Sequence, residues 1–216
     1  MRVQPVSPEV LVERLVDRVL DDLAAERPAD PGRRWRVLVD GAPPTRPGAV
    51  ADALVEPLRA RGRAAVRVSA GDFLRPAGVR FEHGREDPDA LLDDALDTGA
   101  LIREVLDPLG PGGDGSYLPA LWDAARDRSA RAARTPAPPG AVLLLDGGLL
   151  LGRWLPADLT VHLAVRPDTL ARLTPPHEAW RLPAEERYRA ETGPERSADV
   201  VVRVDDPRRP GWVVER

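Results

Sequence analysis

The chain lacks cysteine and lysine, and each absence excludes a kind of chemistry. Without cysteine it has no disulfide, no thiolate nucleophile and no cysteine metal site, so we expect a cytoplasmic protein. The combined count of lysine and arginine is 31, and all 31 residues are arginine. No ammonium side chain is therefore available to bind a phosphate group or to act in catalysis.

Long apolar segments are also missing. No run approaches the roughly 20 residues that cross a bilayer, and the N-terminus lacks a basic segment followed by an apolar one. The arginines are spread among 35 carboxylates, which gives a net charge of -4 without a concentrated basic stripe. The five tryptophans do not interleave with basic clusters. We therefore expect no membrane contact and no nucleic-acid partner.

The length of 216 residues suits one domain, and we expect a single domain over residues 1–216. Apolar spacing predicts an N-terminal amphipathic helix at residues 7–26, followed by a linker at 27–34. Further helices are predicted at residues 47–61, 88–106, 167–173 and 183–191, and strands at 35–39, 64–68, 141–145, 159–165 and 199–204. This alternation predicts an α/β fold with a three-layer parallel sheet and helices on both faces.

Several positions within these elements carry more specific expectations. The run 141–145 is apolar throughout, as in a strand buried on both faces, and we expect it to be the central strand. Thr45 is expected to cap the helix at 47–61, and Pro57 to kink or shorten it. The three histidines have no metal-ligand spacing, so no metal site is predicted, and His162 is expected to be a hydrogen-bonded structural residue.

Residues 41–48 read Gly-Ala-Pro-Pro-Thr-Arg-Pro-Gly, between a predicted strand and a predicted helix. A phosphate-binding loop here would end in Gly-Lys-Ser/Thr, whose lysine contacts the phosphates and whose hydroxyl holds magnesium. Arg46, Pro47 and Gly48 stand at those three positions, and only Gly41 matches the loop pattern. Losing the lysine contact costs about 1.5 to 3 kcal/mol of binding. The segment therefore lies where a phosphate-binding loop is expected, but it lacks the residues that contact the phosphates and magnesium.

The prolines of this segment weaken it further as an anion site. Residues 43, 44 and 47 are prolines, which have no backbone N–H to offer a phosphate. Arg46 has two readings: its guanidinium could bind phosphate in place of the lysine, or it is a surface arginine beside a helix start. The candidate nucleotide-binding residues are Gly41, Thr45, Arg46 and Gly48.

Five later segments complete an ordered pattern. They are Gly71-Asp72-Phe73-Leu74-Arg75-Pro76, Glu86-Asp87-Pro88-Asp89, Asp107-Pro108-Leu109-Gly110-Pro111-Gly112-Gly113, Leu145-Asp146-Gly147 and Ala198-Asp199-Val200-Val201-Val202. Together with the strand, loop and helix before them, they resemble the uridine kinase family of P-loop phosphotransferases over about residues 35–210. The resemblance implies transfer of the γ-phosphoryl group of ATP or GTP to the 5′-hydroxyl of a pyrimidine nucleoside, with magnesium.

The resemblance also implies roles for two carboxylates. The family's catalytic carboxylate lies in a segment like Ser-x-Asp-x-Phe, and aligning Ser69 and Phe73 places Gly71 at that position. Asp72 is one residue late, which turns its side chain to the other face unless a local bulge restores it. Its alternative role is to cap nearby N–H groups. Asp146 matches the acidic residue that supports magnesium through water, or it caps the turn after its strand.

Other matched positions would contact the acceptor or close over the phosphates. By resemblance Glu86 would hold ribose hydroxyls, and Arg75, Arg80, His83 and Arg85 nearby suit a polar substrate pocket. Such a charged loop is equally typical of a solvated surface. Residues 175–194 resemble a short lid that contains Arg181, Arg187 and Arg189. The candidate lid residues are Arg187 and Arg189. Both also fit a surface helix.

Two functional hypotheses follow. The first is an ATP-dependent phosphotransferase acting on a nucleoside or a similar small hydroxyl compound. In this hypothesis Arg46 and Asp72 compensate for the altered loop. The second is a non-catalytic module that binds a nucleotide or another small ligand. Because Pro47, Gly48 and Gly71 remove several members of one catalytic unit, we favour weak or absent transfer. The sequence does not predict an oligomeric state or a protein partner.

Overall fold

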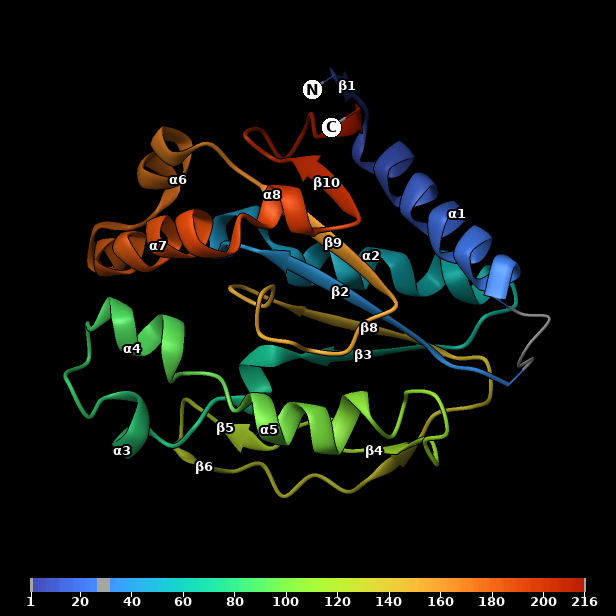
Figure 1. Cartoon of the computed structure of the whole chain (residues 1–216), viewed down its shortest axis with the longest axis horizontal. Helices are drawn as coiled ribbons and strands as arrows, with labels where there is room; N and C mark the ends of the chain where they lie inside the picture. The colour runs from blue at the N-terminus through green and yellow to red at the C-terminus, as the bar shows by residue number, and fades with distance from the viewer. Residues whose placement is uncertain (1, 27–31, 216) are drawn as a thin grey trace.

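A seven-stranded, mostly parallel sheet forms the centre of the computed structural model, which describes residues 2–26 and 32–215 (Figure 1). The strand order is β1-β11-β10-β9-β2-β8-β3. The strands are β1 Arg2–Pro5, β2 Trp35–Gly41, β3 Ala65–Ser69, β8 Val142–Gly147, β9 Leu159–Ala164, β10 Val200–Arg203 and β11 Gly211–Glu215. Strands β10, β9, β2, β8 and β3 run parallel, as the alternation of strands and helices predicts.

Helices connect the parallel strands. They are α1 Pro8–Glu26, α2 Pro47–Ala60, α3 Ala77–Arg80, α4 Pro88–Asp93, α5 Thr98–Leu101, α6 Pro167–Leu173, α7 Leu182–Thr192 and α8 Pro194–Ser197. A wider π-helical turn, Ile102–Leu106, continues α5, and short 3₁₀ turns lie at Pro43–Thr45, Ala70–Phe73 and Pro176–Arg181. Two small hairpin-like pairs join β4 Ser116–Tyr117 to β7 Thr135–Pro136, and β5 Trp122–Asp123 to β6 Arg128–Ser129. Within the described ranges, no helix is long and apolar enough to span a membrane.

The two faces of the sheet pack against different helices, because alternate strand residues point to opposite sides. Val37 and Val39 of β2 pack with the apolar sides of α1 and α2. Leu38, between them, packs instead with Phe73 and with the apolar residues of α5 and the turn that follows it. Figure 1 shows α1 and α2 on one side of the sheet and α5 on the other.

The structure corrects three expectations about the sheet and its helices. Strand β8 lies between β2 and the edge strand β3, so it is not central; its apolar run reflects burial on both faces rather than position. The helix expected at 88–106 is interrupted after Asp93, where Leu96 bridges to Leu74 and Asp97 caps α5. Helix α2 continues past Pro57 to Ala60, so the proline does not end it.

The far edge of the sheet is antiparallel and was not anticipated. Strand β11 pairs antiparallel with both β10 and β1, which places the two ends of the described chain side by side. The residues of β1 are all exposed and include one aliphatic residue, Val3, so they give no periodic signal. Of the linker expected at 27–34, residues 27–31 lie outside the described part of the chain.

Candidate functional site

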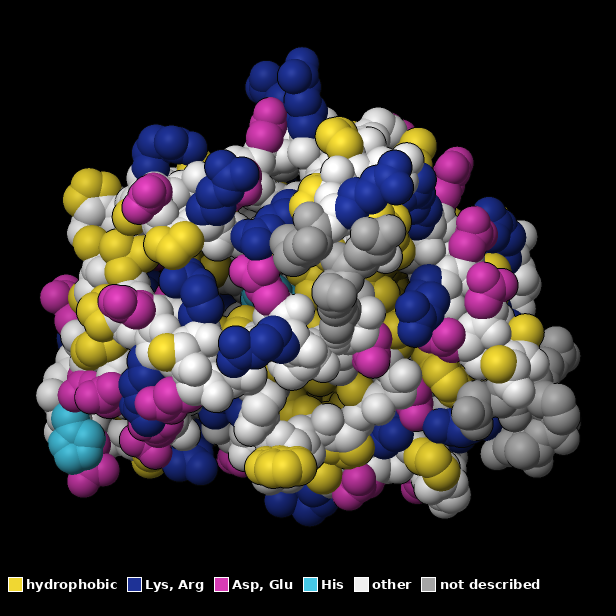
Figure 2. Space-filling view, turned by 45° about the horizontal axis from the view of Figure 1, so that its top comes forward, with side chains coloured by type: hydrophobic (Ala, Val, Ile, Leu, Met, Phe, Trp, Pro, Cys, Tyr) yellow, Lys and Arg dark blue, Asp and Glu magenta, His cyan; other side chains and the backbone are white. Residues whose placement is uncertain are grey.

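A cleft of about 910 Å³ opens where the parallel strands β2, β8 and β3 end. In open α/β sheets, ligands bind outside the carboxyl ends of the strands. One wall is the loop from β2 to α2, another is formed by residues 80–96, and the segment 180–185 faces them. Figure 2 shows arginine and carboxylate side chains interspersed over one face of the molecule.

The loop between β2 and α2 folds back on itself. Thr45 is buried, its N–H donates to the Ala42 carbonyl at 2.8 Å, and its hydroxyl donates to the same oxygen at 2.7 Å. The Arg46 N–H donates to the Pro43 carbonyl at 3.0 Å. Two of the N–H groups that could surround a phosphate are thus used within the loop. The expectation that Thr45 caps α2 is wrong, because its hydroxyl is committed to Ala42.

Arg46 is the N-cap of α2 and holds a left-handed backbone conformation, with φ 57° and ψ 56°. Glycine adopts this conformation without the clash that a Cβ causes. The matching position of a phosphate-binding loop is a glycine. The structure therefore holds Arg46 in a backbone conformation that glycine adopts more readily than arginine. Its side chain is exposed and lines the cleft.

Replacing Arg46 by glycine is expected to stabilise the protein by about 1 kcal/mol, because the left-handed conformation costs a residue with a Cβ roughly that much. Chemical denaturation followed by tryptophan fluorescence would measure the change. Arg63→Gly, outside α2 and the cleft, is the control and should not stabilise the protein. Destabilisation by Arg46→Gly would show that the arginine side chain itself holds the loop.

Gly48, in the first turn of α2, faces an ion-pair cluster. Arg67 of β3 places Nη2 at 2.9 Å from Asp146 Oδ1, and its Nε lies 2.9 Å from Asp52 Oδ1. A Cβ on Gly48 would stand only 2.7 Å from Arg67 Nη2 and 3.1 Å from Asp146 Oδ2. Burial raises the pKa of the Asp146 carboxyl, while the charge of Arg67 opposes that rise. The space beside Gly48 is therefore filled by a guanidinium group.

Gly71 and Asp72 take different places. Ser69 accepts a hydrogen bond from the Gly71 N–H at 3.3 Å, which begins the 3₁₀ turn and leaves Gly71 lining the cleft. Asp72 is exposed and is not among the residues that line the cleft. Desolvation raises the pKa of its carboxyl, opposed by Arg67. Of these two residues, Gly71 and not Asp72 therefore lies at the cleft.

Among the predicted acceptor residues, Glu86 lines the cleft, while Arg75 and His83 do not. Arg75 lies 3.9 Å from Asp94, and the His83 side chain is exposed. Arg80 and Arg85, the other two arginines of this sequence group, do line the cleft. The guanidinium carbons of Arg80 and Arg85 lie 4.7 and 5.2 Å from the ring centre of Phe81.

Of the three arginines in residues 175–194, only Arg181 lines the cleft. Arg187 forms ion pairs with Asp89 and Asp93 of α4, at 3.0 and 2.7 Å, so it holds α7 against α4. It does not line the cleft, and Arg189 lines a separate cavity of about 20 Å³. Arg153, from the loop after β8, also lines the cleft. Burial lowers the pKa of Arg153, whose guanidinium donates to the carbonyls of Leu92 and Leu149.

Three solved structures resemble this one closely in fold. A protein described as a possible uridine kinase from Bacillus stearothermophilus has a TM-score of 0.60 at 18% identity, over 87% of this chain and 98% of that one. A candidate fructose transport system kinase from Silicibacter sp. TM1040 has a TM-score of 0.61 at 22% identity, over 87% and 94%. The D-glycerate 3-kinase of Cryptococcus neoformans var. grubii has a TM-score of 0.56 at 17% identity, over 85% and 80%.

The chain has the fold of P-loop kinases. No family model matches its sequence, and no curated protein does so either. The resemblance seen in the ordered motifs is therefore confirmed at the level of fold. The loop between β2 and α2 is the segment that the sequence predicts to lie where a phosphate-binding loop would stand.

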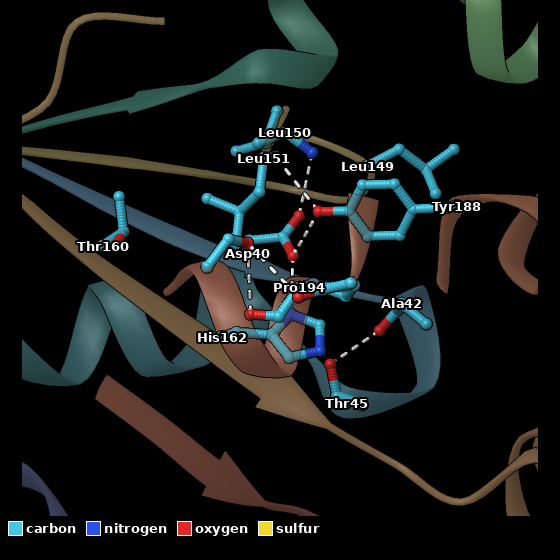
Figure 3. A network of polar contacts seen from close by, with 12 residues as sticks. Asp40, Ala42, Thr45, Leu149, Leu150, Leu151, Thr160, His162, Tyr188 and Pro194 are labelled. Carbon is cyan, nitrogen blue, oxygen red and sulfur yellow. Dashed lines mark hydrogen bonds and ion pairs between the residues drawn. The ribbon is translucent and has the colours of Figure 1, made fainter. Parts of the chain in front are cut away.

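A buried polar network lies directly behind that loop, at the end of β2 (Figure 3). Asp40 is fully buried and accepts hydrogen bonds from the Leu150 N–H at 2.9 Å and the Tyr188 hydroxyl at 2.9 Å; its other contact is His162 Nδ1 at 2.7 Å. The Tyr188 hydroxyl in turn accepts from the Leu151 N–H at 3.0 Å. The expectation of a hydrogen-bonded structural His162 is confirmed.

The network connects the central part of the sheet to the lid-like segment, because Tyr188 lies on α7. From the sequence, Asp40 was predicted only to be the first residue after the strand at 35–39. Its partners are 110 to 148 residues further along the chain, so no local spacing could reveal them. Glu185, one turn before Tyr188, lines the cleft, and burial raises the pKa of its carboxyl to about 7.

Proposed function

We propose that this protein binds a small molecule carrying a phosphate or carboxylate group in the cleft, and that it does not transfer the γ-phosphoryl group of ATP. The loop between β2 and α2 supports the second part. Phosphoryl transfer depends on positioning and on charge stabilisation by a phosphate-cradling backbone and a cation. Here the N–H groups of Thr45 and Arg46 donate within the loop, and three other positions are prolines. The chain has no lysine to supply the missing charge.

The arginines of the cleft support the ligand class. Among the described residues, four cleft-lining arginines have no carboxylate within 4 Å: Arg46, Arg85, Arg153 and Arg181. Guanidinium groups match the two oxygens of a carboxylate or phosphate through paired hydrogen bonds. Glu86 on the same wall could accept hydrogen bonds from hydroxyl groups of the ligand. A hydroxylated anion satisfies both kinds of group.

A second candidate is an ATP-dependent kinase for a small hydroxyl compound such as a nucleoside. The retained cleft favours it, as does the description of the similar structures as uridine, fructose transport system and D-glycerate kinases. In that reaction Asp72 would be the catalytic carboxylate and Asp146 would support magnesium, with ATP and magnesium as cofactors. Arg46 would replace the lysine, and Glu86 would contact the acceptor.

Thermal shift with inorganic pyrophosphate and with citrate tests the binding proposal, and the two probes separate phosphate from carboxylate recognition. Either anion should raise the melting temperature, because a ligand at 100 times its Kd adds about 2.7 kcal/mol of stability. Arg46→Gln and Arg85→Gln should each weaken binding by about tenfold. Arg128→Gln, on the exposed β6, is the matched control and should leave the affinity unchanged.

An assay of ADP release from magnesium-ATP, over a panel of nucleosides, sugars and glycerate, separates the two candidates. Our proposal predicts release no faster than in buffer. Acceptor-dependent release that Asp146→Asn abolishes would establish the kinase instead. A protein whose melting temperature responds to neither anion, at concentrations that saturate ordinary millimolar sites, would refute the binding proposal.

A further inference from the structure

The ion-pair cluster at Gly48 lies where the P-loop kinase fold uses a divalent metal ion. In that fold the hydroxyl of the residue after the lysine and a strand-end carboxylate support magnesium. The corresponding residues here are Gly48, which has no hydroxyl, and Asp146. Between them stands the guanidinium of Arg67, with Nη2 at 2.9 Å from Asp146 Oδ1.

These residues do not fit a divalent cation while Arg67 is in place. A metal ion bound to Asp146 would share its space with a group that is already positively charged, and like charges repel. In the described part of the chain, no group of three or more His, Cys, Asp or Glu side chains is placed to hold a metal ion. Magnesium also requires nearly octahedral ligation by oxygen atoms. Gly48 has no hydroxyl and so offers one oxygen ligand fewer than Ser or Thr would.

The same residues fit a fixed guanidinium group. The Asp146 side chain is only 8% exposed, and a buried carboxylate needs a neutralising partner. Arg67 supplies the positive charge to Asp146 and to Asp52 at once. Gly48 makes this possible, because a Cβ at that position would stand 2.7 Å from Nη2. The glycine that removes the metal-binding hydroxyl is therefore also the residue that admits the arginine.

We propose that the guanidinium of Arg67 takes the place of the divalent metal ion in this cleft, and that anions bind there without metal. The part that concerns anions rests on the proposed function. The part that concerns the metal stands on the contacts of Arg67, Gly48, Asp52 and Asp146 alone. The two parts can be tested separately.

The metal part is tested by titrating manganese(II) into the protein and measuring free ion by electron paramagnetic resonance. The wild-type protein should show no manganese binding that depends on Asp146. Arg67→Ala should gain affinity for manganese of at least about tenfold, because Asp52 and Asp146 lose their shared cation, and adding Asp146→Asn should abolish the gain. The control is Arg61→Ala, which breaks an exposed pair with Asp17 and should bind no more manganese than wild type.

Two outcomes would overturn the metal part: manganese binding by wild type that depends on Asp146, or a folded Arg67→Ala protein that gains no affinity. Far-ultraviolet circular dichroism and a cooperative melt establish that the variant is folded. Should Arg67→Ala not fold, Arg67→Gln removes the charge while keeping a polar side chain, and the same results are expected of it.

The anion part is tested with pyrophosphate, in excess EDTA and in millimolar magnesium. The wild-type melting temperature should rise equally in both. Arg67→Ala should respond less in EDTA than wild type and should recover part of the response with magnesium. Wild-type binding only in magnesium would overturn this inference while leaving the proposed function intact. No response to pyrophosphate in either condition, with citrate also inactive, would refute the proposed function and leave the manganese result to decide the metal part.

Discussion

Replacing Asp40 by alanine is expected to lower the free energy of unfolding by about 4 kcal/mol. The carboxylate is fully buried and contacts three partners, from the loop after β8, from β9 and from α7. The variant leaves the Leu150 N–H, the His162 ring and the Tyr188 hydroxyl without their partner inside the protein. Urea denaturation monitored by tryptophan fluorescence would measure the loss.

Asp199 provides the matched control. Its carboxylate also accepts hydrogen bonds at the start of a strand, from the Thr160 N–H and hydroxyl, but Asp199 is exposed to water. Asp199→Ala should therefore cost about 1 kcal/mol. Tyr188→Phe, which removes one partner of Asp40, should fall between the two. Equal effects of Asp40→Ala and Asp199→Ala would contradict the importance given to the buried network.

The stability of the protein is expected to fall by up to about 3 kcal/mol between pH 4.5 and pH 8 because of Glu185. Burial raises the pKa of this carboxyl from its ordinary value of 4.5 to about 7, and the charge of Asp40 adds to the rise, while Arg189 and Arg181 oppose it. Because the folded pKa exceeds the unfolded one, the stabilising contribution is complete below pH 4.5. It is lost as the pH rises through 7.

Glu185→Gln should remove this pH dependence. The variant should match wild type at pH 4.5 and exceed its stability by up to about 3 kcal/mol at pH 8, measured by denaturation at both values. Glu186→Gln, exposed on the same helix, should behave as wild type at both. Equal slopes for wild type and Glu185→Gln would show that the Glu185 carboxyl ionises in the folded protein as it does in the unfolded chain.

The sequence predicted the parallel strands and most helices, because hydrophobic periodicity within one segment reflects which face of that segment is buried. It did not predict the order of strands. The apolar run of β8 indicated burial correctly, yet both faces of a strand beside the sheet edge can be buried as fully as those of a central one. The pairing of β1 with β11 brings together residues from opposite ends of the described chain, so no local sequence pattern predicts it.

The site was predictable in outline and not in its contacts. The altered residues Pro47 and Gly48 could be located from the strand and helix around them. Arg67 could not be recognised, because it lies within a strand and its role depends on β3 pairing beside β8, with Ser69 opposite Asp146. Asp40 was missed for the same reason. The partners of both side chains are distant in the sequence and come into contact only in the folded sheet.

Two separate parts of the structure support the proposal that the protein does not transfer a phosphoryl group. The loop residues Thr45 and Arg46 use their N–H groups within the loop, and Arg67 fills the space beside Gly48. Introducing Pro47→Lys with Gly48→Thr alone would restore two residue types but would press a new side chain against the Arg67 guanidinium. The altered loop and the arginine of β3 therefore form one interdependent arrangement.

The most direct test of this account is a calorimetric titration of the wild-type protein with ATP, once in magnesium and once in EDTA. The account predicts that magnesium adds nothing: any heat of binding should have the same magnitude and midpoint in both buffers. Saturable binding that appears in magnesium and disappears in EDTA would contradict it, because such binding requires the metal-supported triphosphate site that we propose Gly48 and Arg67 to exclude.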